Sequence, residues 1–171
     1  FPLRLDESMN TVLAQETMRY NRLTAVMRET LQQLMKALKG YVVMSTELDA
    51  MANSLFANLV PVMWEAVGFN SLMPLASWAV DLQNRCQFFT DWLEGGHTPF
   101  VFWISGFFFP QAFLTGAKQN FARKYTKPID GVSFGFEIMK NDWKEIKKGP
   151  EDGCYIRGLF MEGARWCPEE H

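Results

Sequence analysis

The chain has 171 residues, of which 48% are hydrophobic and 21% are charged, and its formal net charge is -2. These values suit one globular domain, or two small units that share a core. They exclude a disordered tail, a collagen-like polypeptide and a strongly basic nucleic-acid binder. Residues 51–117 contain a single base, Arg85, against four acids, which are Glu65, Asp81, Asp91 and Glu94. We therefore expect this middle region to be buried on several sides.

The three cysteines, Cys86, Cys154 and Cys167, are an odd number, and the chain has no N-x-[ST] glycosylation acceptor. This pattern favours reduced thiols in an intracellular protein over a secreted disulfide framework. Charged side chains within residues 4–7 stand where a secretory signal would be apolar. Because the first residue is Phe1 rather than Met, we expect a segment taken from a longer polypeptide.

Residues 95–117 run for 23 positions without Asp, Glu, Lys or Arg, which is long enough to span a bilayer. Pro99, Gly106, Pro110 and Gly116 interrupt this run. In lipid, each interruption would leave backbone polar groups unpaired. The sequence therefore favours a buried element over a membrane-spanning helix.

Apolar side chains at steps of three and four predict a long helix that starts near Ser8 and ends before Gly40. Its stripe consists of Met9, Val12, Leu13, Tyr20, Leu23, Met27, Leu31, Leu34 and Leu38. A second helix is expected over residues 46–58, because Thr46 and Asp49 resemble a capping box. Proline at a first turn predicts three more helices, which begin at Pro61, Pro74 and Pro110 and end near residues 68, 95 and 127.

Residues 100–104 are apolar and rich in aromatic side chains, which favours a short buried strand. Apolar and polar residues alternate over residues 132–138, and this period predicts a second strand. A third strand is expected over residues 155–160, after a long polar loop. Two paired strands are barely stable alone, so we expect the sheet to continue beyond His171. The predicted fold class is α+β and mainly α.

The sequence contains neither a G-x-x-x-x-G-K-[ST] nor a G-x-G-x-x-G phosphate-binding loop. Cys154, Cys167 and His171 lack the spacing of a zinc site. Ser105 and His97 could form a hydrolase nucleophile and base, but nothing in the sequence orients the histidine. We therefore predict no catalytic, cofactor-binding or metal-binding residue in this protein.

Three further patterns each have a functional and a structural interpretation. The acidic turn at residues 151–153 could form a site, although acidic residues before glycine are ordinary turn formers. Phe121 and Tyr125 lie among basic residues, as in some nucleic-acid surfaces, yet helical spacing places both rings on the core face. The basic residues are Lys118, Arg123, Lys124 and Lys127. Met9, Met18, Met27 and Met35 could form an adaptable binding groove, but core filling is the commoner use of methionine.

Ten residues between Phe88 and Phe113 are Phe or Trp. Each large aromatic side chain buries about 150–250 Å². This supply exceeds what a small helical domain needs, so we expect part of the cluster, around residues 107–109, to cover a neighbouring domain.

Several blocks of the sequence resemble the C-terminal region of dynein heavy chains, specifically the axonemal ones of cilia and flagella. The blocks are SMNTVLAQE at residues 8–16, VVMSTEL at 42–48, VPVMW at 60–64, FWISGFFFPQAFLTG at 102–116, QNFARKY at 119–125, PID at 128–130 and EDGCYIRGLFMEGARW at 151–166. They follow the family's order over nearly the whole sequence. Met73 stands where the family usually has lysine and Cys167 where it has aspartate, and neither change affects a catalytic group.

The resemblance implies a helical part, residues 1–127, that lies across a ring of AAA+ modules, and the start of a truncated β-barrel, residues 128–171. In dynein heavy chains the ring binds ATP and Mg, and a distant stalk binds microtubules. The resemblance therefore implies a non-catalytic structural and regulatory segment of an ATP-driven, minus-end-directed microtubule motor.

The same resemblance implies the partners and the location. The partner is the AAA+ ring of the same heavy chain, whereas microtubules and other dynein subunits are partners of the parent polypeptide. No nucleic acid, membrane or cofactor is expected for this segment. The implied location is the cytoplasm, the cytoskeleton and the axoneme of a cilium or flagellum.

An alternative hypothesis is a free-standing helical adaptor that binds a partner protein through its aromatic cluster. The native open reading frame separates the two hypotheses, because a very long polypeptide with upstream phosphate-binding loops favours the motor.

Overall fold

A computed structural model describes residues 8–159 of the protein. Its α-helices are α1 (Ser8–Leu38), α2 (Thr46–Phe56), α3 (Val62–Glu65), α4 (Leu75–Gly95) and α5 (Pro110–Lys124). The other elements are the strands β1 (Val101–Trp103) and β2 (Tyr155–Arg157) and the short 3-10 helices η1 (Ile104–Gly106) and η2 (Ile129–Gly131). The described part is therefore mainly helical with a small sheet, which confirms the mainly α prediction.

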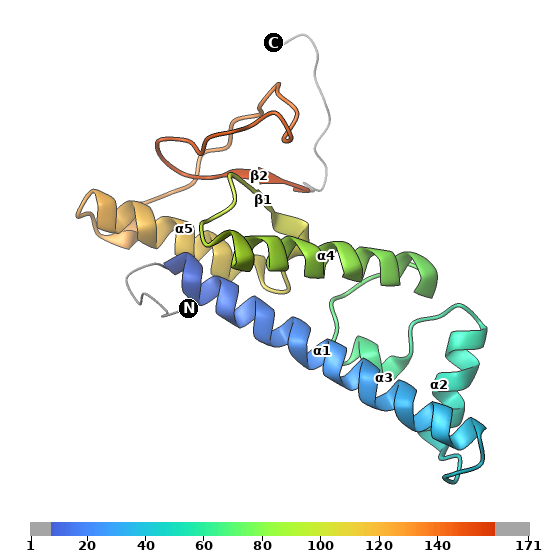
Figure 1. The fold of residues 1–171 in the computed structure, drawn as a ribbon. Coiled ribbons are helices and arrows are strands. Elements are labelled where there is room, and N and C mark those ends of the chain that lie inside the picture. Colours follow the sequence, from blue (N-terminus) through green and yellow to red (C-terminus); the bar gives the residue numbers. More distant parts are fainter. Residues whose placement is uncertain (1–7, 160–171) are drawn as a thin grey trace.

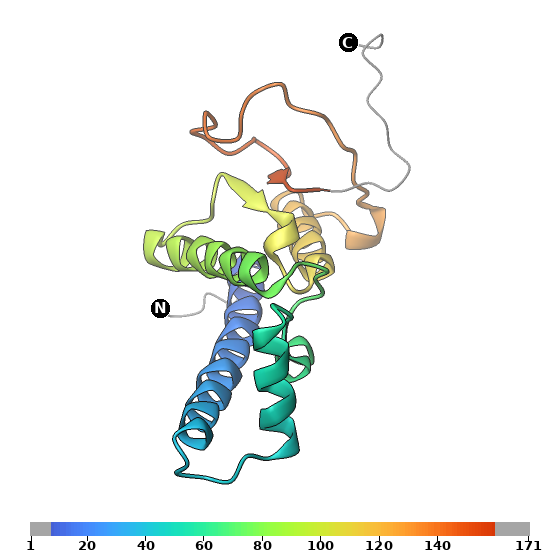
Figure 2. The same ribbon diagram turned by 90° about the vertical axis from the view of Figure 1, so that its right-hand side faces the viewer.

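The long helix α1 is the axis on which the other elements assemble (Figure 1). Helices α4 and α5 lie against its N-terminal half, and α2 returns beside its C-terminal half, as Figure 2 shows. The segment that follows α5 loops around the short sheet, at the opposite end of the molecule from α2 (Figures 1 and 2). The fold is thus a helical arm at one end and a strand-containing end at the other.

Most of the predicted apolar stripe of α1 is buried or half-buried, but Leu31 and Leu38 are 37% and 68% exposed, so the prediction was wrong for these two residues. Gly40 follows the end of the helix, as predicted. Leu23 lies near its middle and is 0% exposed. At the end of the helix, the Gly40 N–H donates to the Ala37 carbonyl, and the Tyr41 N–H donates to the Lys36 carbonyl, both at 2.9 Å. Gly40 has a φ of +76°, a conformation that glycine adopts without steric cost. This pair of bonds closes the helix where the sequence indicated.

The N-cap of helix α2 lies one residue before the predicted cap, Thr46. The N-cap residue is Ser45, whose Oγ accepts a hydrogen bond from the Leu48 N–H at 3.3 Å. Thr46 is therefore the first residue of the helix rather than its cap, and the predicted pairing of Thr46 with Asp49 was wrong. Serine and threonine cap helices almost equally well, so two such residues in succession leave the start ambiguous in the sequence.

Asn58 joins the end of α2 to the start of α4. It has a φ of +59°, and its N–H donates to the Leu55 carbonyl at 3.2 Å. Its own carbonyl accepts from the Leu75 N–H at 2.9 Å, and its Oδ1 accepts from the Ala76 N–H at 3.1 Å. The side chain of Pro74, the N-cap residue of α4, makes no hydrogen bond to the helix. Asn58 therefore supplies the acceptors that the first turn of α4 needs.

Thr126 ends α5 in the same left-handed conformation, with a φ of +51°. Its N–H donates to the Arg123 carbonyl at 3.3 Å. A β-branched residue in this conformation costs roughly 1–2 kcal/mol. We expect Thr126→Gly to raise the free energy of unfolding by about 0.5–1 kcal/mol, because the relief of strain exceeds the entropy lost by a glycine. Urea denaturation measures the change.

Asn58→Gly is the matched control for this prediction. The backbone conformation is the same, but the substitution removes the side-chain acceptor of the Ala76 N–H. We expect it to lower the free energy of unfolding by about 0.5–1.5 kcal/mol. Equal effects of the two glycine substitutions would contradict the assignment of strain to Thr126.

The two strands pair in parallel, with Val101 opposite Tyr155, Phe102 opposite Ile156 and Trp103 opposite Arg157. The prediction of a strand within residues 100–104 is confirmed. β2 forms the first half of the strand predicted over residues 155–160, whose last residue lies outside the described part. The sequence did not predict that β1 is the partner of this strand. The pairing joins the segment before α5 to the segment after it.

The prediction of a strand over residues 132–138 was also wrong, because these residues are irregular. Phe134 and Phe136 stack on each other at 6.4 Å between ring centroids, and Phe136 is 65% exposed. Alternating polarity does not form a strand without a second strand to accept and donate hydrogen bonds. Residues 8–159 form no barrel, and the boundary at residue 127 stays a prediction.

The aromatic cluster fills the core where α1, α4 and α5 meet. Phe102, Phe107 and Phe113 are each at most 5% exposed. The Phe113 ring centroid lies 4.7 Å from that of Phe102 and 5.1 Å from that of Phe107. The expectation that Phe107 faces a neighbouring domain was therefore wrong, whereas Phe109 is 46% exposed. Most of the cluster serves this domain's own core.

Candidate functional site

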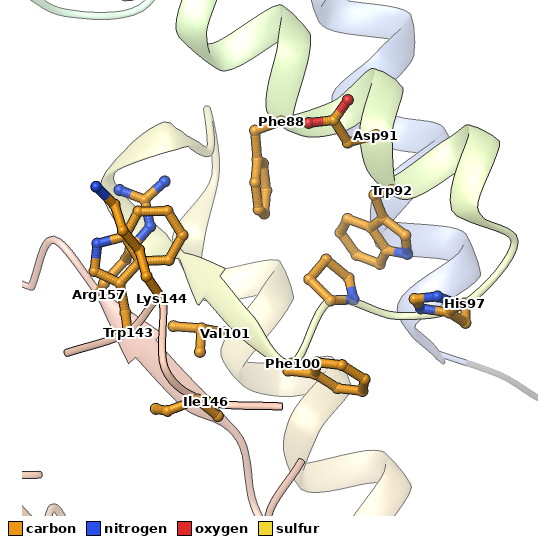
Figure 3. A pocket seen from close by; sticks show the side chains of 11 residues that line it. Phe88, Asp91, Trp92, His97, Phe100, Val101, Trp143, Lys144, Ile146 and Arg157 are labelled. Carbon is orange, nitrogen blue, oxygen red and sulfur yellow. The ribbon is translucent and has the colours of Figure 1, made fainter. Parts of the chain in front are cut away.

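A cleft of about 320 Å³ lies between α4, β1 and the loop that precedes β2 (Figure 3). Its lining residues are Phe88, Asp91, Trp92, His97, Pro99, Phe100, Val101, Trp143, Lys144, Ile146 and Arg157. Figure 3 shows Trp143, Lys144 and Arg157 grouped on one side, and Trp92, His97 and Phe100 on the other. We call this feature the Arg157 cleft, because Arg157 contributes a cation with a buried donor, Nε, that has no acceptor among the described residues.

Arg157 is held between two indole rings. Pairing with β1 places it opposite Trp103, and its guanidinium carbon lies 4.9 Å from the Trp103 ring centroid and 4.2 Å from that of Trp143. Its Nε is buried and has no hydrogen-bond acceptor among the described residues. Burial lowers the pKa of Arg157, yet a guanidinium keeps its charge in proteins. The cleft therefore contains a fixed cation with an unused donor.

The opposite side of the cleft is aromatic and faces solvent in part. The His97 ring stacks on Phe100 at 5.9 Å, and its Nδ1 lies 3.2 Å from the Thr98 carbonyl oxygen. Phe100 and Trp143 are both 44% exposed. The cleft thus combines cationic groups with accessible aromatic surface.

A polar clamp from α1 holds the segment that leads into α5. The Glu16 carboxylate accepts from the Phe108 N–H at 2.6 Å and from the Phe109 N–H at 3.1 Å. One turn later, the Tyr20 hydroxyl donates to the Gly106 carbonyl at 2.6 Å. Burial raises the pKa of Glu16, an effect that the two N–H donors only partly offset, and burial also raises the pKa of Tyr20. These buried groups are fully used in positioning the backbone.

Arg85, the single base of residues 51–117, also has a structural role. Its Nε donates to Asp81 Oδ2 at 2.6 Å. Its guanidinium carbon lies 4.0 Å from the Phe69 ring centroid and 5.5 Å from that of Trp103. The pair is largely buried, with side-chain exposures of 11% and 15%. This agrees with the expectation that the middle region is buried.

Ser105 and His97 are not brought together as a nucleophile and a base. His97 lines the Arg157 cleft, and Ser105 does not. Ser105 lies beside Gly158 instead, where a Cβ added to the glycine would be 2.5 Å from the serine Oγ. Within residues 8–159, no hydrogen bond joins the two candidates. Their arrangement gives no support to a hydrolase.

The acidic turn at residues 151–153 is bound to the end of α5. Asp152 accepts from Lys124 Nζ at 2.7 Å and from the Tyr125 hydroxyl at 2.7 and 2.8 Å. These bonds lower the pKa of Asp152 and raise that of Lys124. The turn thus acts as a tether in this fold.

The expected core position of Phe121, in α5, and of Tyr125, the C-cap residue of α5, was wrong. Tyr125 is 41% exposed, and Phe121 is only half-buried and lies 4.7 Å from the Tyr125 ring. The buried face of α5 consists of Phe113, Gly116 and Ala122. The tether to Asp152 holds Tyr125 away from that face.

The methionines of α1 divide between core and surface. Met9 is buried and Met27 contacts the core, as expected, whereas Met18 and Met35 are 70% and 55% exposed. The core-filling interpretation was therefore wrong for Met18 and Met35. Their positions on the helix face solvent.

The cysteines show no sign of metal binding in the described part of the protein. Cys86 and Cys154 are free thiols, and burial raises the pKa of Cys154 to about 11, which disfavours the reactive thiolate. Residues 8–159 contain no group of three His, Cys, Asp or Glu that could hold a metal ion. Cys167 and His171 lie outside these residues.

None of the helices in residues 8–159 combines the length and apolarity that crossing a membrane requires. The run at residues 95–117 is divided among the end of α4, β1, η1 and the start of α5. Proline and glycine thus separate these elements, as their positions in the sequence indicated.

Sequence reasoning missed Arg157, Trp143 and the clamp formed by Glu16 and Tyr20. No short motif marks these residues, since each depends on a partner far away in the sequence. One signal was available: Glu16 precedes Tyr20 of the predicted stripe by four residues and so lies on the same face of the helix, where a buried acid requires donors.

The described residues define a mainly helical domain whose buried polar groups hold its own segments together. Residues 1–171 match the family described as the C-terminal domain of the dynein heavy chain, and the protein belongs to this family. It is 57% identical over 169 residues to dynein axonemal heavy chain 1 of Homo sapiens, and the match covers 99% of this sequence and 4% of that relative.

Two further relatives show comparable similarity. Dynein axonemal heavy chain 3 of Homo sapiens and dynein axonemal heavy chain 12 of Mus musculus are each 52% identical over 166 residues, or 97% of this sequence. The protein spans 4% and 5% of the lengths of these relatives. The family resemblance noted in the sequence is therefore confirmed.

Proposed function

We propose that this protein is a non-catalytic structural and regulatory segment of an axonemal dynein heavy chain. The parent motor would be ATP-driven, minus-end-directed and located in the axoneme of a cilium or flagellum. ATP and Mg would bind in its AAA+ ring, and microtubules and other dynein subunits would be partners of the parent polypeptide. The observation that carries this proposal is the 57% identity to dynein axonemal heavy chain 1 over 99% of the sequence.

The chemistry of the described residues supports a non-catalytic role. Glu16 and Asp152 accept hydrogen bonds from segments far away in the sequence, and Arg85 pairs with Asp81 within α4. Groups paired in this way stabilise a structure and are not free to act as a general acid or base. The segment therefore contributes shape and contact surface.

Exposed apolar side chains support packing on the AAA+ ring of the same heavy chain. Phe56 is 96% exposed, Val43 is 90% exposed and Leu72 is wholly exposed. Large apolar side chains exposed to this degree suit a contact with another protein surface. The same side chains could contact a partner protein if the protein were a free-standing helical adaptor, which is the alternative hypothesis. A short native open reading frame would favour that alternative.

The isolated protein should neither bind nor hydrolyse ATP. The physical reason is that it offers no phosphate-binding loop and no assembled acid–base pair in residues 8–159. Phosphate release should match a buffer blank once contaminating ATPases are removed. Saturable turnover that disappears on Ser105→Ala or His97→Ala would contradict the non-catalytic role.

Ring packing is tested in the motor domain of the parent heavy chain. Phe56→Asp should slow or uncouple microtubule-stimulated ATP turnover while nucleotide affinity stays unchanged, because it places a charge in the proposed contact. Glu29→Ala is the control on an exposed polar position. Unchanged motor activity with Phe56→Asp would exclude this surface as a contact with the ring.

A further inference from the structure

We propose that the Arg157 cleft binds an acidic, apolar segment of the same heavy chain that lies outside residues 1–171. This inference rests on the proposed function, because it requires a parent heavy chain. It goes further by naming a second contact site, at the strand-containing end of the molecule, and the chemistry of its occupant.

The charge of the cleft selects an acidic occupant. Arg157 and Lys144 both line it, and within residues 8–159 neither has a carboxylate at ion-pairing distance. Asp91 is the acid in the lining, and its Oδ1 already accepts from Gln87 Nε2 at 2.6 Å. The cleft therefore presents two cations that a carboxylate could pair with.

The geometry of Arg157 favours this pairing. The Arg157 guanidinium lies against the Trp103 and Trp143 rings, and such ring contacts leave its N–H groups to bind an acceptor. The buried Nε without an acceptor is an unsatisfied donor of the kind that native proteins rarely keep. A carboxylate that pairs with the Arg157 guanidinium from the cleft would accept charge-assisted hydrogen bonds.

The rest of the lining selects apolar side chains beside the acid. Trp92, Val101 and Ile146 also line the cleft, and the Phe100 ring is exposed. A volume of about 320 Å³ is at the lower end for binding pockets, which suits one or two side chains rather than a large cofactor. An acidic residue next to an aromatic or aliphatic one matches both halves of the cleft.

The relatives indicate where such a segment would come from. This protein spans only 4% of dynein axonemal heavy chain 1, so nearly all of a parent heavy chain lies outside it. A segment of the same polypeptide binds at a high effective concentration, often millimolar, and therefore needs only a small site. A partially open cleft of this size is sufficient for an intramolecular contact.

The test uses the motor domain of the parent heavy chain and a water-soluble carbodiimide, which joins an amine to a carboxylate that touches it. Mass spectrometry should find Lys144 joined to an aspartate or glutamate of the same heavy chain outside residues 1–171. Arg157→Gln should reduce the yield of this cross-link severalfold. Lys148→Gln, a change at an exposed lysine of the same loop, should leave the yield unchanged.

Hydroxyl-radical labelling provides the second measurement. Trp143 and Phe100 should be labelled severalfold more slowly in the native motor domain than in the Lys144→Gln variant, which alters an exposed side chain and should not affect folding. Equal labelling of the native protein and the variant would overturn the proposal. Cross-links from Lys144 that stay within residues 1–171, or that reach only another polypeptide, would also overturn it. If Phe56 is protected from labelling while Trp143 is not, the result supports packing on the AAA+ ring and contradicts the proposal that the Arg157 cleft is occupied.

Discussion

Leu23→Ala should lower the free energy of unfolding by about 2–5 kcal/mol. Leu23 is 0% exposed at the centre of α1, so the substitution removes buried apolar surface and leaves a cavity. Helix propensity adds little to this effect, because leucine and alanine are both good helix formers. Urea or thermal denaturation of the purified protein gives the value.

Leu38→Ala is the matched control, the same substitution in the same helix at a residue that is 68% exposed. It should change the free energy of unfolding by less than about 0.5 kcal/mol. If both substitutions have small effects, the stripe of α1 does not form the core. If both have large effects, the exposed end of α1 is covered by a contact that the described residues do not supply.

Glu16→Ala should lower the free energy of unfolding by about 2–6 kcal/mol, because two part-buried N–H groups lose their acceptor at roughly 1–3 kcal/mol each. These are the Phe108 and Phe109 groups at the start of α5. Glu16→Gln keeps one acceptor oxygen and should have a smaller effect. Glu29→Ala, at an exposed glutamate of the same helix, should stay within about 0.5 kcal/mol.

The effect of Glu16→Ala should also depend on pH. Burial raises the pKa of Glu16 in the folded protein, so the folded state binds the proton more tightly than the unfolded state does. Its contribution to the free energy of unfolding is therefore fully present below about pH 4, near the unfolded pKa, and declines as the pH rises through the folded pKa. The difference between wild type and Glu16→Ala should shrink over this range. A difference that grows with pH would show that the hydrogen bonds outweigh burial.

The helices were predictable because their signals are local. The apolar steps of α1, Gly40 after its end, and proline at the start of α5 each act within a few residues of where they stand. The Ser45 cap was misplaced by only one residue, since its neighbour Thr46 has the same capping chemistry. Local chemistry therefore determined where the helices lie and which face of α1 is buried.

The candidate site was not predictable in the same way, because its residues come from separate parts of the sequence. Arg157 is an ordinary basic residue until the pairing of β1 with β2 places it opposite Trp103. Trp143 reaches it from a loop whose course no local pattern specifies. Glu16 likewise finds its two donors on a segment 92 and 93 residues later in the sequence.

By itself, the sequence determined that this protein is mainly helical, that α1 is its longest helix and that its motifs are those of the C-terminal domain of dynein heavy chains. Only the tertiary structure decided that residues 132–138 form no strand, that β2 pairs with β1, and that the Phe107 ring lies in the core. The physical reason is that helices satisfy their backbone hydrogen bonds locally. Strands and buried charges depend on partners that distant segments must provide.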